Sequence, residues 1–283
     1  MPELPEVETV CRSLRQTVLD QYIRTVTVTR SRLLPNNTIE EFSETLCGHC
    51  FSAVHRRGKY ILLDLDHDMT LVVHLRMTGK LLYQLSDSPL DKHSHIVFEL
   101  DGGHRLCYND VRQFGTLQLL PTALWTQLPG IAALGPEPLE DDFTAEWLMQ
   151  QMVGKKQKVK AFLLDQHNIA GIGNIYADEI LFQAHIHPEE PVCNLTDTET
   201  VQDLWFAIRD RLEQGIRYGG SSIKDYVDSL GQAGSFQKQH RAYGRGGQPC
   251  TECGCTMLKM ISGGRSSCYC PNCQPRRDSF VLP

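Results

Sequence analysis

The sequence lacks an apolar run near the ~20 residues of a membrane-spanning helix, and its acidic start does not resemble a secretory leader. Aromatic residues make up only 8% of its 283 residues, and the formal net charge is −6. That charge argues mildly against nucleic acid as a partner, unless positive side chains gather on one face. No P-loop lysine and no Rossmann-type strand accompanies its glycine-bearing turns, so a nucleotide cofactor is not expected. We therefore expect a cytoplasmic protein with no membrane partner.

Cysteine, by contrast, is abundant, and six of the 11 cysteines lie near the C-terminus. In a cytoplasmic protein such clustering favours a metal site over disulfides. The predicted ligands of one structural Zn²⁺ are Cys250, Cys253, Cys270 and Cys273. Two CxxC pairs are preferred because the two-residue spacing lets each turn wrap around one ion. The neighbouring Cys255 and Cys268 leave a second register open, and the isolated pair Cys47 and Cys50 is interpreted as buried or incidental thiols.

The chain is long enough for two domains, and its patterns predict an α+β fold. A helix at the N-terminus precedes strand-like runs at residues 23–29, 60–65, 71–75, 96–100, 106–108 and 116–120. Short strands separated by turn residues indicate an N-terminal antiparallel β-sandwich. A connector rich in Pro and Gly spans residues 129–138, and helical periodicity then runs from residue 143 to Arg217.

The first six residues, MPELPE, allow two interpretations. Removal of Met1 would make Pro2 a terminal amine, which titrates near ~8 rather than lysine's ~10.4 and can form a Schiff base with a carbonyl carbon. Glu3 and Glu6 would then stand beside that amine and move protons. The same residues also suit a plain helix start, because Pro5 favours the first turn and acidic side chains favour its positive end. Both interpretations can hold, since a helix can present its own N-terminus.

Two loops in the β-rich half of the chain place a charged side chain close in sequence to large apolar side chains. Met77 follows a strand beside a glycine, and Arg112 and Phe114 lie in the loop of residues 109–115. An apolar wedge and a planar guanidinium are what a protein needs to open a duplex at one nucleotide. Taken alone, Met77 and Phe114 fit a hydrophobic core as well.

The helical half carries a basic segment from Lys155 to Lys160 that contains no acid. Such a segment suits either a solvated helix entry or a phosphate-binding surface. A glycine-bearing turn at residues 169–173 leads into a helix that starts near Asn174, where backbone N–H groups can hold an anion. Basic residues also outnumber acidic ones between Gly234 and the C-terminus, which answers the objection from net charge.

The opening PELPEVETV closely resembles that of formamidopyrimidine-DNA glycosylases, the bacterial repair enzymes for oxidised purines, and further motifs follow along the whole chain in that family's order. The resemblance implies a β-sandwich at 1–130, a helix–two-turn–helix domain at 131–239 with a lesion-covering loop at 219–239, and a zinc finger at 240–274. The implied catalytic residues are Pro2 (nucleophile), Glu3 (acid/base), Lys59 (β-elimination) and Arg265 (δ-elimination). The implied DNA-binding residues are His93, Arg112, Lys156, Asn174, Met77 and Phe114.

The resemblance also implies a partner and an activity. The expected partner is double-stranded DNA that contains 8-oxoguanine, formamidopyrimidines or abasic sites, cleaved by β,δ-elimination through a Pro2 Schiff base. The expected enzyme is a monomer of the bacterial cytosol or nucleoid. Thr78 departs from the acidic residue of several relatives, which leaves base recognition open. The alternatives are an oxidised-pyrimidine glycosylase of the endonuclease VIII type, whose members open with PEGPE, and a non-catalytic binder of damaged DNA.

Overall fold

The computed structural model describes residues 1–223 and 225–277 and divides the chain into two compact units. Unit 1 contains Met1–Ala132 and Gly215–Gln237, and unit 2 contains Ala133–Gln214 and the chain from Lys238 onward. Most of the segment 219–239 thus clusters with the β-rich unit, although Lys224 lies outside the described residues. Within the described part of the chain, no helix is both long and apolar enough to cross a membrane.

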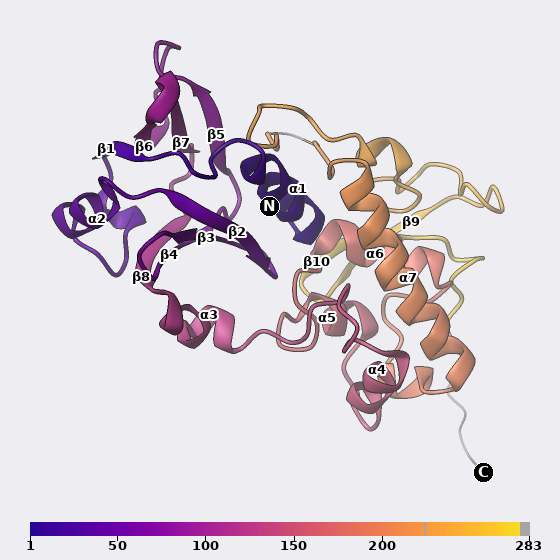
Figure 1. Cartoon of the computed structure of the whole chain (residues 1–283). Helices are drawn as coiled ribbons and strands as arrows, with labels where there is room; N and C mark the ends of the chain where they lie inside the picture. Colours follow the sequence, from indigo (N-terminus) through magenta and orange to yellow (C-terminus); the bar gives the residue numbers. More distant parts are fainter. Residues whose placement is uncertain (224, 278–283) are drawn as a thin grey trace. The chain divides into compact units, whose positions relative to one another are not determined.

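Unit 1 contains two four-stranded antiparallel sheets, which confirms the predicted sandwich (Figure 1). One sheet has the order β2 (Phe51–Arg57), β3 (Tyr60–Leu65), β4 (Met69–His74), β8 (Thr116–Pro121). The other has the order β1 (Ile23–Val28), β6 (Ser94–Leu100), β7 (His104–Asp110), β5 (Gly79–Leu85). Strands β2 and β5 were not among the predicted runs, because glycine and several charged or polar residues dilute their apolar alternation.

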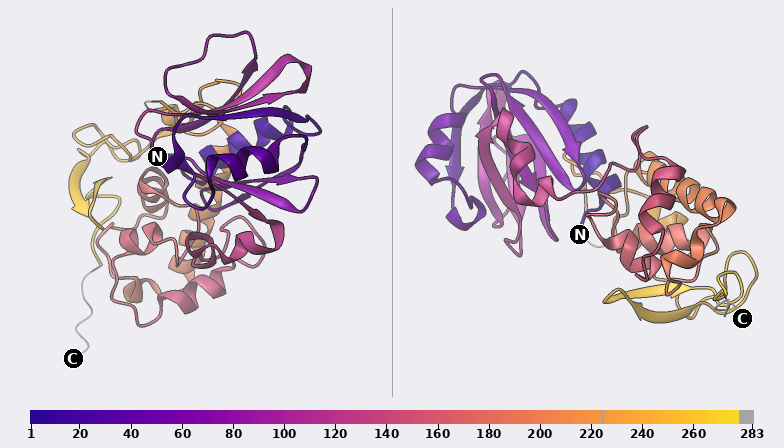
Figure 2. Two further views of the ribbon diagram at one scale, coloured as in Figure 1. Left: turned by 90° about the vertical axis from the view of Figure 1, so that its left-hand side faces the viewer. Right: turned by 90° about the horizontal axis from the view of Figure 1, so that it is seen from below.

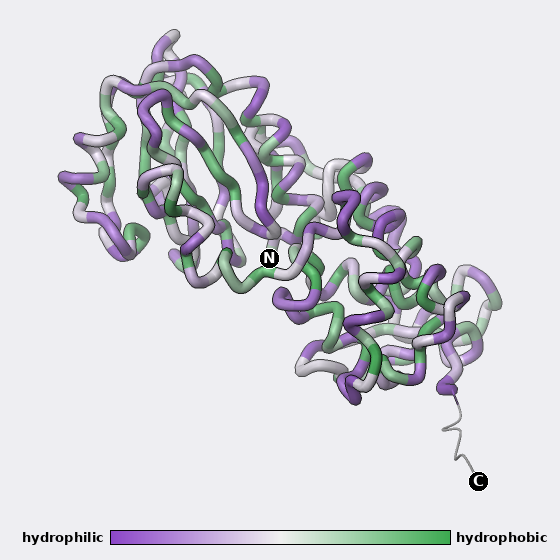
Figure 3. Tube along the Cα trace, turned by 60° about the horizontal axis from the view of Figure 1, so that its bottom comes forward, coloured by the Kyte–Doolittle hydropathy of each residue, from purple (hydrophilic) through white to green (hydrophobic). Residues whose placement is uncertain are grey.

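Alternation along the strands sends side chains to opposite faces of each sheet. On β3, Ile61 and Leu63 join the core between the sheets, whereas Leu62 lies in a smaller cluster with Ile131 on the outer face. Phe98 of β6, in the opposite sheet, belongs to the same core cluster. The Cα tube in Figure 3 shows the resulting mixture of hydrophobic and hydrophilic positions along the strands.

Helix α1 (Leu4–Arg15) packs on β2, and α2 (Ile39–Leu46) packs on β1. Helix α2 starts with a reciprocal cap, in which Thr38 Oγ1 accepts from the Glu41 amide at 3.1 Å and Glu41 accepts from the Thr38 amide at 3.0 Å. A short helix α3 (Pro129–Ala132) ends the first part of unit 1. Short 3₁₀ turns occur at Ser31–Leu33, Asp101–Gly103, Thr122–Gln127, Val192–Leu195 and Phe236–Gln239.

The second unit is helical and carries a hairpin, as predicted (Figure 2). Its helices are α4 (Ala145–Met152), α5 (Val159–Leu164), α6 (Asn174–Gln183) and α7 (Thr198–Arg217), whose last residues belong to unit 1. Strands β9 (Leu258–Ser262) and β10 (Arg265–Tyr269) form the hairpin. Its two-residue turn is Gly263–Gly264, and both glycines have positive φ, a conformation that other residues rarely adopt.

Candidate functional site

The N-terminal residues form the first turn of α1. Glu3 is the N-cap residue, and its amide donates to Glu6 Oε2 at 2.8 Å. Glu3 and Glu6 are only 3% and 2% exposed, Pro2 is also buried, and Met1 is 48% exposed. Pro5 occupies the first turn, so the helix-start interpretation describes the geometry, and the same helix holds Pro2 and Glu3 at its tip.

Glu6 also binds the segment that returns to unit 1 from the helical region. Its Oε1 accepts from the Ser221 amide at 2.7 Å, and its carbonyl accepts from the Tyr226 hydroxyl at 3.1 Å. Gly220 has a φ of +80°, and a Cβ there would approach Glu6 Cγ to 2.9 Å. Glu6 is therefore a structural link between the Pro2 turn and this loop, a role that its position in the sequence did not reveal.

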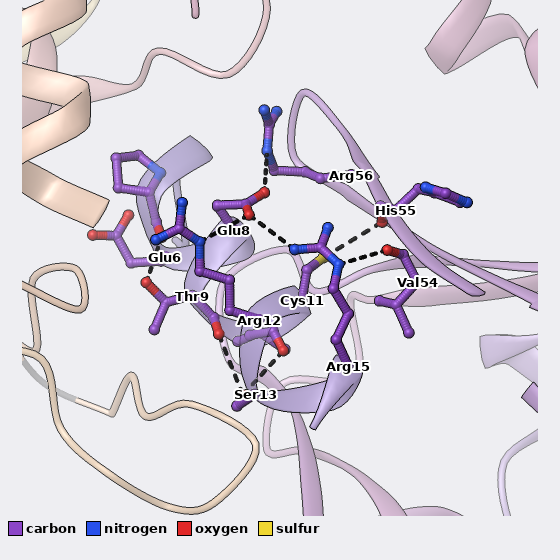
Figure 4. Close-up of polar contacts among 12 residues, drawn as sticks. Glu6, Glu8, Thr9, Cys11, Arg12, Ser13, Arg15, Val54, His55 and Arg56 are labelled. Carbon is purple, nitrogen blue, oxygen red and sulfur yellow. Dashed lines mark hydrogen bonds and ion pairs between the residues drawn. The ribbon is translucent and has the colours of Figure 1, made fainter. Parts of the chain in front are cut away.

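A cluster of charged side chains joins α1 to β2 (Figure 4). Glu8 accepts from Arg56 Nε of β2 and from Arg15 Nη1 of α1, each at 3.1 Å. Arg15 Nε additionally donates to the Val54 carbonyl at 2.8 Å, and the Cys11 thiol donates to the His55 carbonyl at 3.4 Å. Helix α1, which follows Pro2 and Glu3, is thereby fixed to the strand that leads to Lys59.

The electrostatics of Glu8 show that this junction is charged. Burial raises the pKa of Glu8, but Arg15 and Arg56 outweigh it and hold that pKa below its usual range. The ionised carboxylate therefore persists at neutral pH and keeps both arginines in place. Because Glu8 and Arg56 are 48 residues apart, the sequence alone did not indicate this contact.

Lys59 lies in the turn between β2 and β3 and is only 6% exposed. The next residue, Tyr60, is paired with His74 of β4, and their rings meet edge to face with centroids 4.6 Å apart. Burial, together with the positive charges of Arg76 and Lys59, lowers the pKa of His74 to about 3. His74 Nδ1 accepts from the Arg76 amide at 3.0 Å, as a neutral imidazole can.

We expect His74 to make the protein sensitive to acid. An unfolded histidine titrates near ~6.5, so between that pH and about 3 the unfolded chain binds a proton that the native chain does not. Stability from this residue is therefore complete above ~6.5 and falls by about 2 kcal/mol between pH 7 and pH 5. Urea unfolding at both pH values should show a smaller loss for His74→Gln than for the wild type. Equal losses in the two proteins would contradict the assignment.

The wedge candidates lie together at one end of unit 1. Met77 and Phe114 are 47% and 51% exposed, so neither belongs to the core. Arg112 Nη1 is 3.0 Å from Met77 Sδ, and its guanidinium lies 4.6 Å from the centroid of the Phe114 ring. An exposed arginine between two exposed apolar side chains can enter a base stack, which a buried cluster could not.

Asp110, which the sequence did not single out, organises these loops. It is fully buried, and Oδ1 accepts from Thr78 Oγ1 at 2.5 Å and from the Arg112 amide at 3.2 Å. Oδ2 accepts from the Gly115 amide at 2.9 Å and from the Tyr108 hydroxyl at 3.3 Å. The hint in the sequence is an Asp two residues before Arg112, a spacing typical of a side chain that bonds its own loop. Thr78 thus positions the loop through Asp110.

We expect Asp110→Asn to lower the free energy of unfolding by about 1.5–3 kcal/mol, because an amide cannot accept all four of these hydrogen bonds. It should also weaken insertion into DNA, measured as fluorescence of 2-aminopurine opposite a lesion. Asp101→Asn is the matched control, since that carboxylate is partly exposed and pairs with Arg24. A variant as stable and active as the control would exclude the organising role.

The two histidines in the segment Lys-His-Ser-His at residues 92–95 differ in environment. His93 is partly exposed, and its amide donates to Asp91 Oδ1 at 2.7 Å. His95 is 4% exposed, and its Nε2 lies 3.1 Å from the Asp110 carbonyl. His95 is therefore part of the framework around Asp110, while His93 remains accessible to a ligand.

In unit 2, the basic segment separates into exposed and buried lysines. Lys156 is exposed, but Lys160 is fully buried inside α5 and pairs with Asp178 Oδ1 at 2.7 Å. The inclusion of Lys160 in a phosphate-binding surface is therefore wrong. Periodicity could not show this, because the partner carboxylate lies on α6, 18 residues further along the chain.

The Lys160–Asp178 pair holds the hairpin that carries Arg265. Lys160 Nζ donates to the Ser266 carbonyl at 2.9 Å, and Asp178 accepts from Ser267 Oγ at 2.7 Å and from the Cys268 amide at 3.1 Å. Asn174 Nδ2 also donates to the Ser266 carbonyl, at 3.0 Å. Within unit 2, the structure therefore brings Asn174 next to the strand of Arg265, whose own side chain is exposed.

The four cysteines of the two CxxC pairs converge, with their Sγ atoms within 4.8 Å of one another. The Sγ atoms of Cys253 and Cys270 are 3.5 Å apart, and those of Cys250 and Cys273 are 3.9 Å apart. Four thiolates around one Zn²⁺ would stand about 3.8 Å apart, given Zn–S bonds of about 2.3 Å. The cluster can therefore hold a metal ion.

The two remaining cysteines of this region have other roles. The backbone N–H of Cys255 lowers the pKa of Cys253 to about 7, which favours the thiolate that a metal needs. Cys268 lies on β10, and its amide is bonded to Asp178. Neither thiol joins the converging group in the described residues, so the geometry selects the CxxC register.

These features define a class: proteins with an N-terminal helix on a β-sandwich, a helical unit and a four-cysteine hairpin. The chain belongs to the formamidopyrimidine-DNA glycosylase family, whose N-terminal domain model matches residues 1–117 and whose H2TH domain model matches residues 134–227.

Relatives and solved structures agree with this assignment along the whole chain. Formamidopyrimidine-DNA glycosylases from Carboxydothermus hydrogenoformans and Desulforamulus reducens are 46% and 43% identical over 97% of this chain and 100% and 99% of their own lengths. The Lactococcus lactis enzyme in complex with DNA that contains an abasic site is 36% identical, with a TM-score of 0.91 over 97% of this chain and 100% of that one.

Proposed function

We propose that this protein is a base-excision repair DNA glycosylase that removes oxidised purines and cleaves the resulting abasic strand by β,δ-elimination. The observation that carries the proposal is the Pro2–Glu3 start of α1, held by buried Glu6, in a chain that matches the family from end to end. Lactococcus lactis relatives with a TM-score of 0.91 are seen with formamidopyrimidine-containing and abasic DNA.

The proposed chemistry begins at the Pro2 nitrogen, which becomes a free amine when Met1 is removed. Its lone pair attacks C1′ of the damaged nucleotide while the base leaves with the electrons of the glycosidic bond. Glu3, which is buried beside it, transfers the protons that open the sugar ring to an iminium. The iminium acidifies the C2′–H bond, so loss of that proton expels the 3′ phosphate, with Lys59 assisting. Arg265 assists the second elimination, which expels the 5′ phosphate.

The other assigned residues would bend and hold the DNA. Met77, Arg112 and Phe114 are exposed and adjacent, so they suit the gap left when the damaged nucleotide rotates out. The proposed phosphate contacts are His93, Lys156, Asn174 and Arg265. Two other cations near the C-terminus are held by ion pairs within the protein, since Arg241 pairs with Glu252 and Arg277 pairs with Asp197.

The metal is proposed to be one structural Zn²⁺, bound by Cys250, Cys253, Cys270 and Cys273. Backbone N–H groups of Glu252 and Cys273 point at the sulfurs of Cys250 and Cys270, each at 3.4 Å, which suits thiolate ligands. When bound, zinc supplies no reaction step, because four protein ligands leave no open position. Elemental analysis should find one zinc fewer per chain in Cys270→Ser than in the wild type.

The proposed setting is the bacterial cytosol or nucleoid, where the enzyme acts as a monomer on damaged duplex DNA. The domain roles proposed are a catalytic sandwich at 1–130, a DNA-binding helical domain at 131–239 with its lesion loop, and a finger at 240–274.

Borohydride trapping on defined duplexes tests the function. The protein should form a covalent adduct with 8-oxoguanine and abasic duplexes and nick both. Oxidised pyrimidine is the second candidate substrate, because a Lactococcus lactis relative is also seen with oxidised-pyrimidine DNA. A thymine glycol duplex that is nicked faster than the 8-oxoguanine duplex would favour that candidate. Salt-sensitive binding without any adduct would instead indicate a non-catalytic binder.

A further inference from the structure

Two histidines and an aspartate gather at one end of the sandwich, outside the site described above. His49 lies between α2 and β2, and Asp66 and His67 form the turn between β3 and β4. His49 Nδ1 is 2.8 Å from Asp66 Oδ1, and His67 Nδ1 is 3.4 Å from the same oxygen. Their potential ligand atoms all lie within 4.8 Å of one another.

The backbone around the cluster is fixed from both sides. The Ile23 amide donates to the His49 carbonyl at 2.8 Å, and the Asp66 amide donates to the Cys50 carbonyl at 3.2 Å. The loop and the turn are therefore tied together by main-chain bonds that do not involve the three side chains. The side-chain donors are held close before any ion arrives, which lowers the entropy cost of binding one.

The imidazole rings of His49 and His67 are stacked, with centroids 3.4 Å apart and an angle of 21° between their planes. His67 Nδ1 has only its 3.4 Å contact with Asp66 Oδ1, and His67 Nε2 is buried without a hydrogen-bond partner in the described part of the chain. A buried nitrogen without a partner is costly, and a metal ion would supply one.

We propose that His49, Asp66 and His67 form a second metal site, which binds a divalent transition ion such as Zn²⁺, Ni²⁺ or Co²⁺. Imidazole nitrogens and a carboxylate are the donors that these ions prefer. Ligands about 2.0–2.1 Å from a tetrahedral ion stand about 3.3–3.5 Å apart, so small side-chain adjustments would seat the ion. His67 would gain a partner for one of its nitrogens. The three side chains are 27–35% exposed, which leaves an entry path and an open coordination position.

Cys50 does not belong to this group of potential ligands, so the described residues supply three protein donors for the ion. The third group of potential ligands in the described residues, His185, Glu252 and Cys273, shares a cysteine with the finger and is not an independent site.

Titration with Co²⁺ of the full-length protein that holds one equivalent of Zn²⁺, enough for the four-cysteine site, tests the proposal. The wild type should take up one further equivalent and develop visible absorption, while the zinc already bound stays in place. His49→Gln and His67→Gln should each weaken this uptake more than about tenfold.

His55→Gln is the matched control. His55 is an exposed histidine that pairs with one carboxylate, Asp64, at 3.3 Å, so it offers two donors instead of three. This variant should bind Co²⁺ as the wild type does. Uptake of no second equivalent, or equal uptake by His67→Gln and His55→Gln, would overturn the proposal. Thermal melts without Co²⁺ establish that each variant is folded, and nicking assays are independent of the result.

Discussion

Blocking the Pro2 nitrogen should abolish the borohydride-trapped adduct and slow strand cleavage at least about a thousandfold, the scale seen when a covalent nucleophile is removed. An N-terminal extension converts that nitrogen from an amine into an amide, whose lone pair is delocalised into the carbonyl. The change touches no side chain of the fold. Met1 is 48% exposed, so the chain has room to continue outward from this point.

The control is the same extension with a protease site that leaves Pro2 first after cleavage. Cleavage of the extension should restore both the adduct and the nicking rate. Pro5→Ala separates the two interpretations of the motif, because it alters the first turn of α1 but leaves the amine intact. That variant should keep its adduct and lose only stability. Strand cleavage that persists with the extension in place would show that another residue is the nucleophile.

Asp178→Asn should lower the free energy of unfolding by about 3–5 kcal/mol, because it leaves the ammonium of fully buried Lys160 without its counter-charge. Burial raises the pKa of Asp178, while Lys160, Ser267 and the Cys268 amide favour its ionised form. The same carboxylate holds β10, so the variant should also loosen the hairpin of Arg265. Chemical denaturation measures the first effect, and the salt dependence of duplex binding measures the second.

Lys158→Gln provides the comparison for that experiment. Its ion pair with Glu189 lies nearby in unit 2, but the Lys158 side chain is 50% exposed. Exposed pairs contribute little, so this variant should lose less than about 1 kcal/mol. If both variants lost the same small amount, the buried pair would not be what secures the hairpin.

Local patterns in the sequence predicted the secondary structure well where one face of an element is apolar. The runs at 60–65 and 96–100 became β3 and β6, and the helical period after residue 143 became α4 and α5. Strand β2 was missed because Arg56 and Arg57 interrupt its pattern. Arg56 is compatible with a strand only because Glu8, 48 residues earlier, neutralises it, and local periodicity carries no information about that partner.

The residues of the candidate site also separate into those that the sequence predicted and those that only the fold revealed. The sequence by itself predicted the groups whose chemistry depends on chain position or short spacing: the nitrogen that Pro2 would expose after removal of Met1, its neighbour Glu3, and the CxxC pairs, which converge in the structure. Only the tertiary structure decided that Lys160 is a buried anchor, that Thr78 donates to Asp110, and that His49 meets His67. The physical reason is that the energy of a charge or a hydrogen bond depends on burial and on the partner. Both are fixed by segments that are distant in the chain and adjacent only after folding.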